Sequence, residues 1–308
     1  MIVRLLSDEK GSAIIIFALG LTVFLGFSAL VTDVGILYLS DYKLTNAVDA
    51  AVLAGAQELP YNPQGAVTQA TNYAIANGLK EEQFSIEVLK DNKLIRITAE
   101  KDVNLLFAKV LGFDTGKVNH VAEAQVAAIV GINGAAPLGI EKHDFVFGEQ
   151  YTLKVGAGDT DYLNQEISPG WFGALALGGP GASTYEDNLT YGYPGSLKVG
   201  DIVNIQTGNI SGPTKKAIDY RIAEDKHVPY CTVDNFERDC SRLIKVPVIE
   251  AVDKKRVKII GFSMFLVDDV TGQGNESYVK GKFVKTIASG EVSPEAQDYG
   301  LVGVRLVK

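Results

Sequence analysis

Basic residues are scarce in this sequence. It holds 29 Lys and Arg against 37 Asp and Glu, which leaves a formal net charge of -8 at pH 7. An acidic surface repels the phosphates of nucleic acids, and no basic stripe offsets that repulsion. The composition therefore excludes nucleic acid from the expected partners. The acidic excess is too diffuse to indicate a particular cationic partner.

Cysteine is scarce as well, since the chain contains only Cys231 and Cys240, with eight residues between them. This spacing does not match the CxxC pairs of metal and redox sites. A bond between the two would close a small ring, worth roughly 2–3 kcal/mol by loop entropy. We expect a disulfide if this part of the chain is exported; two reduced thiols are the alternative in a reducing compartment.

Motifs that carry chemistry are missing. The sequence has no G-x-S-x-G elbow, its Gly178–Gly181 run lacks the Lys-Ser/Thr ending of a phosphate loop, and its three histidines lack metal-ligand spacing. Asp159 and Asp161 are spaced as D-x-D, but the calcium-loop pattern around them is not met. We therefore predict that the protein is not an enzyme and holds neither a metal ion nor a cofactor. An anchored hydrolase that uses these two carboxylates is the weakest alternative.

Charge is absent from residues 12–31, which form a long apolar run. Twenty residues in a helix span about 30 Å, the thickness of a bilayer core, and an isolated span satisfies its backbone only as a helix. A buried core helix and a cleaved signal peptide are the alternatives. The run is longer than the apolar part of a usual signal peptide, and Phe27 stands where a small residue would precede a cut after Ala29. The sequence therefore predicts an uncleaved transmembrane anchor.

The charges on either side of the span predict its orientation. Arg4 and Lys10 precede it, so residues 1–11 are expected in the cytoplasm and the rest of the chain outside a plasma membrane crossed once. Asp33 lies just past the span. We interpret it as a solvated residue that marks the membrane exit; a functional ionisable group is the alternative.

A helical period continues beyond the span from Asp33 to Leu59, before Pro60 and Pro63. Small residues let helices approach closely, and this segment is rich in them. The predicted packing residues are Ala47, Ala50, Ala51, Ala54 and Gly55. They either pack on the protein's own sheet or mediate self-association on a partner helix.

The same segment resembles a known family. Gly11, the Asp33-Val34-Gly35 triplet and the stretch Val48–Ala56 look like the N-terminal region of TadG-like proteins, from the TadE/TadG group of Flp (tight adherence) pilus assembly. The resemblance implies pilus-assembly or other envelope proteins as partners. TadE-type pseudopilins carry a Glu where this chain has Ile16, so the TadG-like pattern fits better and peptidase processing is not expected. The D-x-S-x-S metal motif of some TadG-like proteins is also absent. Residues 208–214 and the strand after Cys240 are similar to the C-terminal region of Gram-positive members.

The remaining chain predicts an α+β fold. Residues 66–77 and 103–111 are expected as short helices, residues 84–89 and 94–99 as a hairpin, and residues 118–130 as a strand, which together make a pilin-like α+β domain over 32–130. Small residues and Pro at 131–137 indicate a linker. Residues 138–308 then form a β-rich domain, sandwich or barrel, whose expected strands are 151–155, 172–177, 202–206, 243–250, 257–267, 278–287 and 300–306, with a helical turn at 213–220.

The functional hypothesis is a non-enzymatic, membrane-anchored envelope protein in Flp-type pilus assembly or adhesion. It depends on the resemblance and on the missing chemistry. A surface receptor or adhesin is the alternative, in which exposed aromatic residues around Trp171, Tyr185 and Tyr191 would bind a glycan or another ligand.

Overall fold

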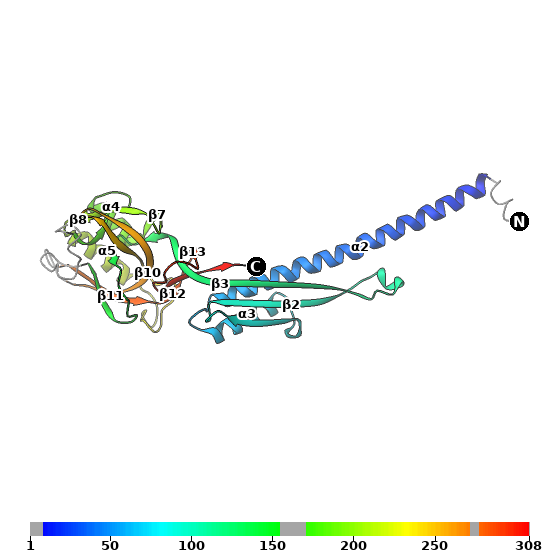
Figure 1. Ribbon diagram of the computed structural model, residues 1–308, viewed down its shortest axis with the longest axis horizontal. Helices are drawn as coiled ribbons and strands as arrows, with labels where there is room; N and C mark the ends of the chain where they lie inside the picture. Colours follow the sequence, from blue (N-terminus) through cyan, green and yellow to red (C-terminus); the bar gives the residue numbers. More distant parts are fainter. Residues whose placement is uncertain (1–8, 155–170, 272–276, 308) are drawn as a thin grey trace. The chain divides into compact units, whose positions relative to one another are not determined.

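The computed structural model describes residues 9–154, 171–271 and 277–307. The chain divides into two compact units (Figure 1): unit 1 is Met1–Gln125 with Leu306–Lys308, and unit 2 is Val126–Arg305. A long N-terminal helix followed by β-rich structure confirms the predicted α+β class.

Unit 1 begins with α2, a single helix of 48 residues from Glu9 to Ala56. It contains no proline that would break it. The apolar run 12–31 and the helical segment predicted after it therefore form one continuous helix. It ends at Ala56, ahead of Pro60. Helix α3 (Pro63–Ala76) then starts with Pro63 in its first turn, and the Asn62 side chain caps it by accepting a hydrogen bond from Gly65 N at 2.9 Å.

The sheet of unit 1 is an antiparallel meander, as predicted for its first two strands. Strand β1 (Phe84–Leu89) turns through three residues of positive φ, Lys90, Asp91 and Asn92, into β2. Strands β2 (Leu94–Asn104) and β3 (Thr115–Ala135) pair from Leu94↔Gln125 to Asn104↔Thr115. The short 3-10 helices are η1 (Glu81–Gln83) and η2 (Ala108–Leu111).

The prediction of a helix over 103–111 was wrong. Pairing with β3 keeps residues 103 and 104 extended, and only Ala108–Leu111 makes a helical turn. The apolar residues of this segment are therefore not one face of a helix. They sit at the end of a long hairpin, where β2 turns into β3 (Figure 1).

The core of unit 1 lies between the second half of α2, the helix α3 and the sheet. Small and branched side chains fill it because the elements approach closely. Its buried members include Leu44, Ala47, Val48, Ala51 and Val52 of α2, Ala66, Ala70 and Ala74 of α3, and Leu94, Ile95, Ile97 and Ala122 of the strands.

Unit 2 is built on an antiparallel sheet in the order β9–β10–β11–β5. These strands are β9 (Leu243–Asp253), β10 (Arg256–Thr271), β11 (Tyr278–Val284) and β5 (Gln150–Lys154). The other elements are β4 (Ile140–Glu141), β6 (Trp171–Leu175), α4 (Ala182–Tyr191), β7 (Tyr193–Lys198), β8 (Ile202–Thr207), α5 (Ser211–Ala223), β12 (Thr286–Ile287), β13 (Glu291–Ser293) and β14 (Leu301–Leu306, of which only Leu306 falls in unit 1). The helix α4 and the strand β7 were not predicted.

Both faces of strand β10 are buried, which explains its nearly continuous apolar sequence. Met264 and Leu266 face one cluster, which also contains Trp171 and the two cysteines. Phe265 and Val267 face a second cluster, which includes Tyr185 and Leu189 of α4 and Ala217 and Ile218 of α5. Unit 2 is thus β-rich as predicted, with two helices contributing to the core on one side of its sheet.

The segment where we predicted a linker is extended backbone for most of its length. Residues 131–135 belong to the end of β3, where Ile132 pairs with Leu197 of β7. The small residues that suggested a linker are accommodated within this strand, and Ala135 and Ala136 are buried. The predicted domain limits of 32–130 and 138–308 stay predictions.

Candidate functional site

The first half of α2 is apolar on every side. Among the described residues, α2 is the one helix long and apolar enough to cross a membrane, with a mean hydropathy of 2.6 in a window of which 0% is buried. Large apolar side chains from Ile14 to Val31 are exposed around the whole helix. A core helix would bury such side chains, so this exposure disfavours the interpretation of residues 12–31 as a buried helix.

Asp33 is not the solvated residue that we predicted. Its side chain is buried, with 5% of the residue exposed, and its carboxylate binds the backbone of the hairpin end. The oxygen Oδ1 accepts from Leu106 N at 2.8 Å, and Oδ2 accepts from Phe107 N at 3.0 Å and from Ala108 N at 2.6 Å. Three successive N–H groups that face one carboxylate form an anion-binding nest. Its place at the membrane exit stays a prediction.

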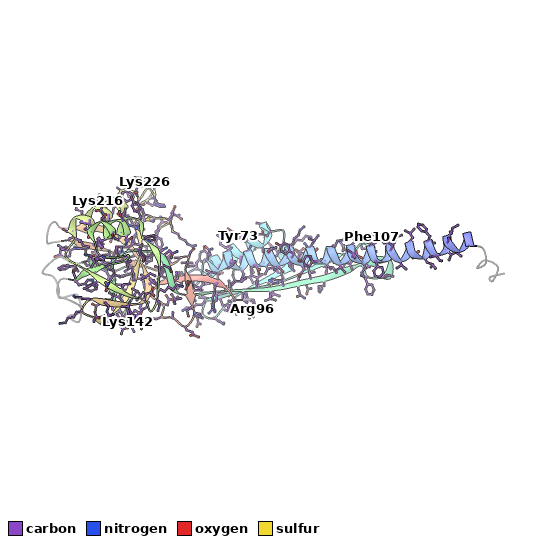
Figure 2. The ribbon with its side chains drawn as sticks, turned by 90° about the horizontal axis from the view of Figure 1, so that it is seen from above. Tyr73, Arg96, Phe107, Lys142, Lys216 and Lys226 are labelled. Atoms are coloured by element: carbon purple, nitrogen blue, oxygen red, sulfur yellow. A yellow bond between two sulfur atoms is a disulfide. The ribbon has the colours of Figure 1, made fainter. Side chains whose placement is uncertain are left out.

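Two further contacts hold the hairpin along α2. A Cβ on Gly116 would lie 2.6 Å from Leu37 Cδ2, so only glycine allows β3 to pass this close to the helix. His120 Nε2 lies 3.2 Å from Asp49 Oδ1. Positions 33, 37 and 49 of α2 thus contact the hairpin at residues 106, 116 and 120. The hairpin therefore runs along α2, and its end lies toward the apolar half of the helix. Figure 2 labels Phe107 at that end.

The predicted packing residues lie on the part of α2 that builds the core of unit 1. Ala47, Ala51 and Gly55 are buried, and Ala50 and Ala54 are half-buried. A Cβ on Gly55 would lie 2.7 Å from Ile95 Cδ1 and 2.8 Å from the Ala66 carbonyl oxygen. The small residues thus let α3 and β2 approach α2 within one chain. Their proposed part in self-association is not needed to explain them.

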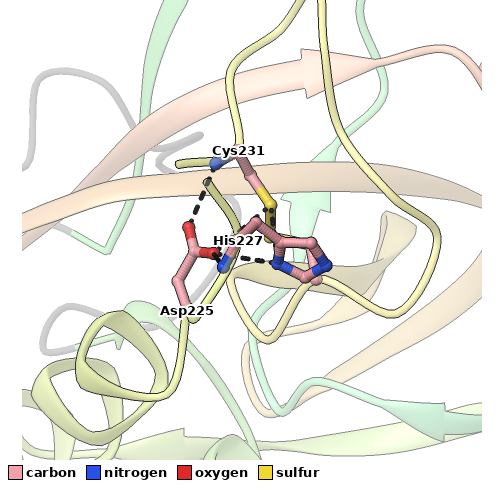
Figure 3. Close-up of side chains that lie close together, drawn as sticks. Asp225, His227 and Cys231 are labelled. Carbon is pink, nitrogen blue, oxygen red and sulfur yellow. Dashed lines mark hydrogen bonds and ion pairs between the residues drawn. A yellow bond between two sulfur atoms is a disulfide. The ribbon is translucent and has the colours of Figure 1, made fainter. Parts of the chain in front are cut away.

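A second group of polar residues surrounds the disulfide of unit 2. Cys231 and Cys240 form the predicted bond, with their Cα atoms 6.7 Å apart. Buried Asp225 accepts hydrogen bonds from His227 N and Cys231 N, both at 3.2 Å, and pairs with Arg242 Nη1 at 3.3 Å. Figure 3 shows Asp225 and His227 beside the sulfur of Cys231.

His227 lies between two carboxylates. Its Nδ1 is 3.0 Å from Asp225 Oδ1, and its Nε2 is 3.1 Å from Asp239 Oδ1. The hydrogen bond with Asp225, supported by Asp239, raises the pKa of His227 above its ordinary value against the opposing effect of desolvation. Desolvation would raise the pKa of Asp225, but its hydrogen bonds and Arg242 outweigh it and lower that pKa.

This group has the residue types of a metal site, because ligand atoms of Asp225, His227, Cys231 and Cys240 lie within 4.8 Å of one another. Cysteine binds zinc as a thiolate, and here both sulfurs are in the disulfide, so neither is available as a ligand. Asp225 is occupied by Arg242 and two backbone amides. The arrangement therefore serves to hold the loop 225–242 in place. We predicted that His227, like the other two histidines, lacks metal-ligand spacing; the signal that pointed to this cluster is the spacing Asp225-x-His227-x₃-Cys231.

The exposed aromatic cluster expected for a receptor does not form. Trp171 is 2% exposed and donates from Nε1 to the Ala174 carbonyl at 2.7 Å, and Tyr185 is buried with its hydroxyl 3.1 Å from Thr214 Oγ1. Tyr191 alone of the three is exposed. Asp159 and Asp161, the carboxylates of the hydrolase alternative, lie outside the described residues.

A fully apolar helix that continues as the core of an α+β unit defines a class of proteins suited to anchoring at a membrane. The model of the Tad family, described as "Putative Flp pilus-assembly TadE/G-like", matches residues 11–58, and so falls on α2 and the turn after it. The TadG-like resemblance is thereby confirmed for this segment. The match connects the chain with pilus-assembly machinery, and the matched family is in general non-catalytic. No curated protein and no solved structure matches the chain.

Proposed function

We propose that this protein is a non-enzymatic, membrane-anchored envelope protein that acts in Flp-type pilus assembly or adhesion. The observation that supports it most is α2. One helix carries an exposed apolar half and a half packed in the core of unit 1, and the Tad match covers the join between them.

The proposed topology places residues 1–11 in the cytoplasm, residues 12–31 in the plasma membrane, and both units outside the cell. Arg4 and Lys10 before the span support this orientation. The disulfide between Cys231 and Cys240 supports it as well, because such bonds persist in oxidising compartments.

The work of such a protein is structural. Because α2 passes from the span into the core of unit 1 without a break, unit 1 is held at a fixed height above the membrane. Partner proteins of the pilus-assembly machinery or the envelope would bind the surface of the protein, outside the core of unit 1. Self-association through α2 would use its exposed face, which includes Tyr38, Leu39 and Tyr42, because its small-residue face is already packed.

Deletion of the gene tests this proposal. We expect loss of surface pili and of adhesion, and recovery of both when the full chain is returned. Normal pili and adhesion without the gene would contradict the proposal.

A matched pair of leucines on α2 then tests the anchor. Leu21→Arg places a charge in the middle of the apolar run, at a cost of about 2.5–3.5 kcal/mol to insertion, and should fail to restore the pili. Leu53→Arg is the control, because Leu53 is also exposed on α2 but lies beyond the run, and it should restore them. Recovery with both variants would show that pilus assembly does not require the anchor.

A further inference from the structure

Residues 105–114 form the end of the β2–β3 hairpin, and we call this segment the tip loop. It carries an apolar surface that no described part of the chain covers. Five large apolar side chains are exposed there, with Val110 88% and Leu111 78% exposed: Leu106, Phe107, Val110, Leu111 and Phe113. Surface turns of soluble proteins are mostly polar, and an exposed apolar cluster marks a site of interaction.

The tip loop is folded, and its shape is fixed from within. Leu105 N donates to the Asp114 carbonyl at 3.0 Å, which closes the hairpin. Phe113 N donates to the Ala108 carbonyl at 3.1 Å, and Gly112 takes a left-handed φ of 91° that ends η2. These bonds pair backbone groups within the loop while its apolar side chains are exposed, an arrangement that suits a loop entering an apolar medium.

Asp33 sets the height of the tip loop relative to the apolar span. Three tip-loop amides bind its carboxylate, and Asp33 follows the last residue of the run, Val31, by two positions. At 1.5 Å per residue, Asp33 lies about 3 Å beyond the run, at the level of the lipid headgroups. The tip loop is therefore held where the hydrocarbon core ends.

The composition of the tip loop suits this level. Phe107 and Phe113 are aromatic, and aromatic rings favour the membrane interface. Exposed Lys109 has a long apolar stem and a cationic end, which can reach anionic headgroups while the stem stays among the acyl chains. A protein partner would have to reach the same position through the lipid that already surrounds α2.

We infer that the tip loop is a second membrane contact, whose apolar side chains enter the outer leaflet beside α2 while Asp33 sets its depth. The contact makes unit 1 a two-point attachment and restricts its rotation about the helix. This inference rests on the proposed anchoring of α2.

The test uses the full chain in phospholipid vesicles that contain some anionic lipid. Single valines are replaced by cysteine and labelled with a polarity-sensitive fluorophore, without reductant, so that the disulfide stays closed. Val110→Cys reports the tip loop, Val23→Cys the middle of the span, and Val67→Cys an exposed site on α3 of the same unit. Quenching is measured with lipids that carry a nitroxide near the headgroup or near the chain end, and with a water-soluble quencher.

We expect the emission of the label at 110 to shift to the blue and to be quenched by the shallow nitroxide. The label at 23 should be quenched by the deep nitroxide, and the label at 67 should be quenched by neither. Quenching at 23 without quenching at 110 would overturn the inference and leave the anchor intact. A label at 110 shielded from both lipid and aqueous quenchers would indicate a second protein surface and also overturn it. No lipid quenching at 23 would instead remove the anchoring itself.

The variant Asp33→Asn tests whether Asp33 sets the depth of the tip loop. It keeps the size of the side chain but replaces one accepting oxygen with a donor. Quenching at 110 should decrease, whereas quenching at 23 should not change. Unchanged quenching at 110 would show that Asp33 does not set the depth of the tip loop.

Discussion

The two units differ in how much of their apolar sequence they bury. In unit 2 the apolar strand β10 is buried on both faces, and the loop of the disulfide is tied to the core by Asp225 and Arg242. In unit 1 the second half of α2 packs in the core with α3 and the strands, whereas the apolar side chains of its first half and of the tip loop are exposed. The hydrophobic effect acts equally on both units. The exposed apolar surface of unit 1 therefore indicates that an apolar environment other than the protein core covers it.

The difference also concerns how buried charge is used. Asp225 of unit 2 is paired with Arg242, whereas Asp33 of unit 1 binds only backbone N–H groups among the contacts described. In the proposed topology Asp33 lies near lipid, where a second charged side chain is costly, and the backbone amides bind its carboxylate without one. Each unit therefore satisfies its carboxylate in the way that its surroundings allow.

The largest effect should come from a pair of phenylalanines, one in each unit. Phe265→Ala removes a buried ring that contacts Phe283, and should lower the free energy of unfolding of unit 2 by about 3–5 kcal/mol. Phe113→Ala, in the exposed tip loop, should change the stability of unit 1 by less than about 0.5 kcal/mol. Fluorescence of Trp171 reports unit 2, and hydrogen exchange in β2 reports unit 1. Equal losses would contradict the contrast between the units.

Loss of the disulfide should affect unit 2 alone. We expect the double variant Cys231→Ser, Cys240→Ser to lower the stability of unit 2 by about 2–3 kcal/mol, because the unfolded loop gains freedom. Denaturant titration followed by Trp171 fluorescence measures this loss, and wild-type protein with reductant should behave alike. An unchanged unfolding midpoint would show that Asp225 and Arg242 hold the loop without the bond.

The close approach inside unit 1 is tested on two glycines of α2. Gly55→Ala forces a methyl group against Ile95 and Ala66, and should destabilise unit 1 by about 1–3 kcal/mol. Gly35→Ala is the control, because nothing lies within 4 Å of its added Cβ, and alanine there should stabilise the helix by about 0.5–1 kcal/mol. Hydrogen exchange of α3 amides distinguishes the two. Tolerance of both would mean that α3 packs less closely than described.

The smallest effect should be a pH dependence confined to unit 2. The raised pKa of His227 means that its charged form favours the folded state, so this stabilisation is complete below the unfolded pKa of about 6.5. It is lost as the pH rises through the higher folded value. The difference in unfolding free energy between wild type and His227→Gln should therefore shrink from pH 5 to pH 8. A difference that grows over this range would contradict the assignment.

Local pattern was sufficient to predict much of the fold. The uncharged run 12–31, the period of α2 and the alternation in β1 and β2 each depend on near neighbours in sequence. The helix expected at 103–111 failed because its apolar residues belong to a hairpin end, which pairs with β3 and binds Asp33, more than seventy positions earlier. The partners of Asp225 likewise come together only in the fold. Long-range contacts of this kind leave no periodic signal.

In the proposed topology α2 anchors the chain in a membrane with both units outside. Cell fractionation with alkaline extraction, followed by protease treatment of spheroplasts, tests it on the full chain. We expect the protein to stay in the membrane pellet, protease to remove both units, and a tag at the N-terminus to be protected. Recovery in the soluble fraction, or protection of the two units with digestion of the tag, would contradict it.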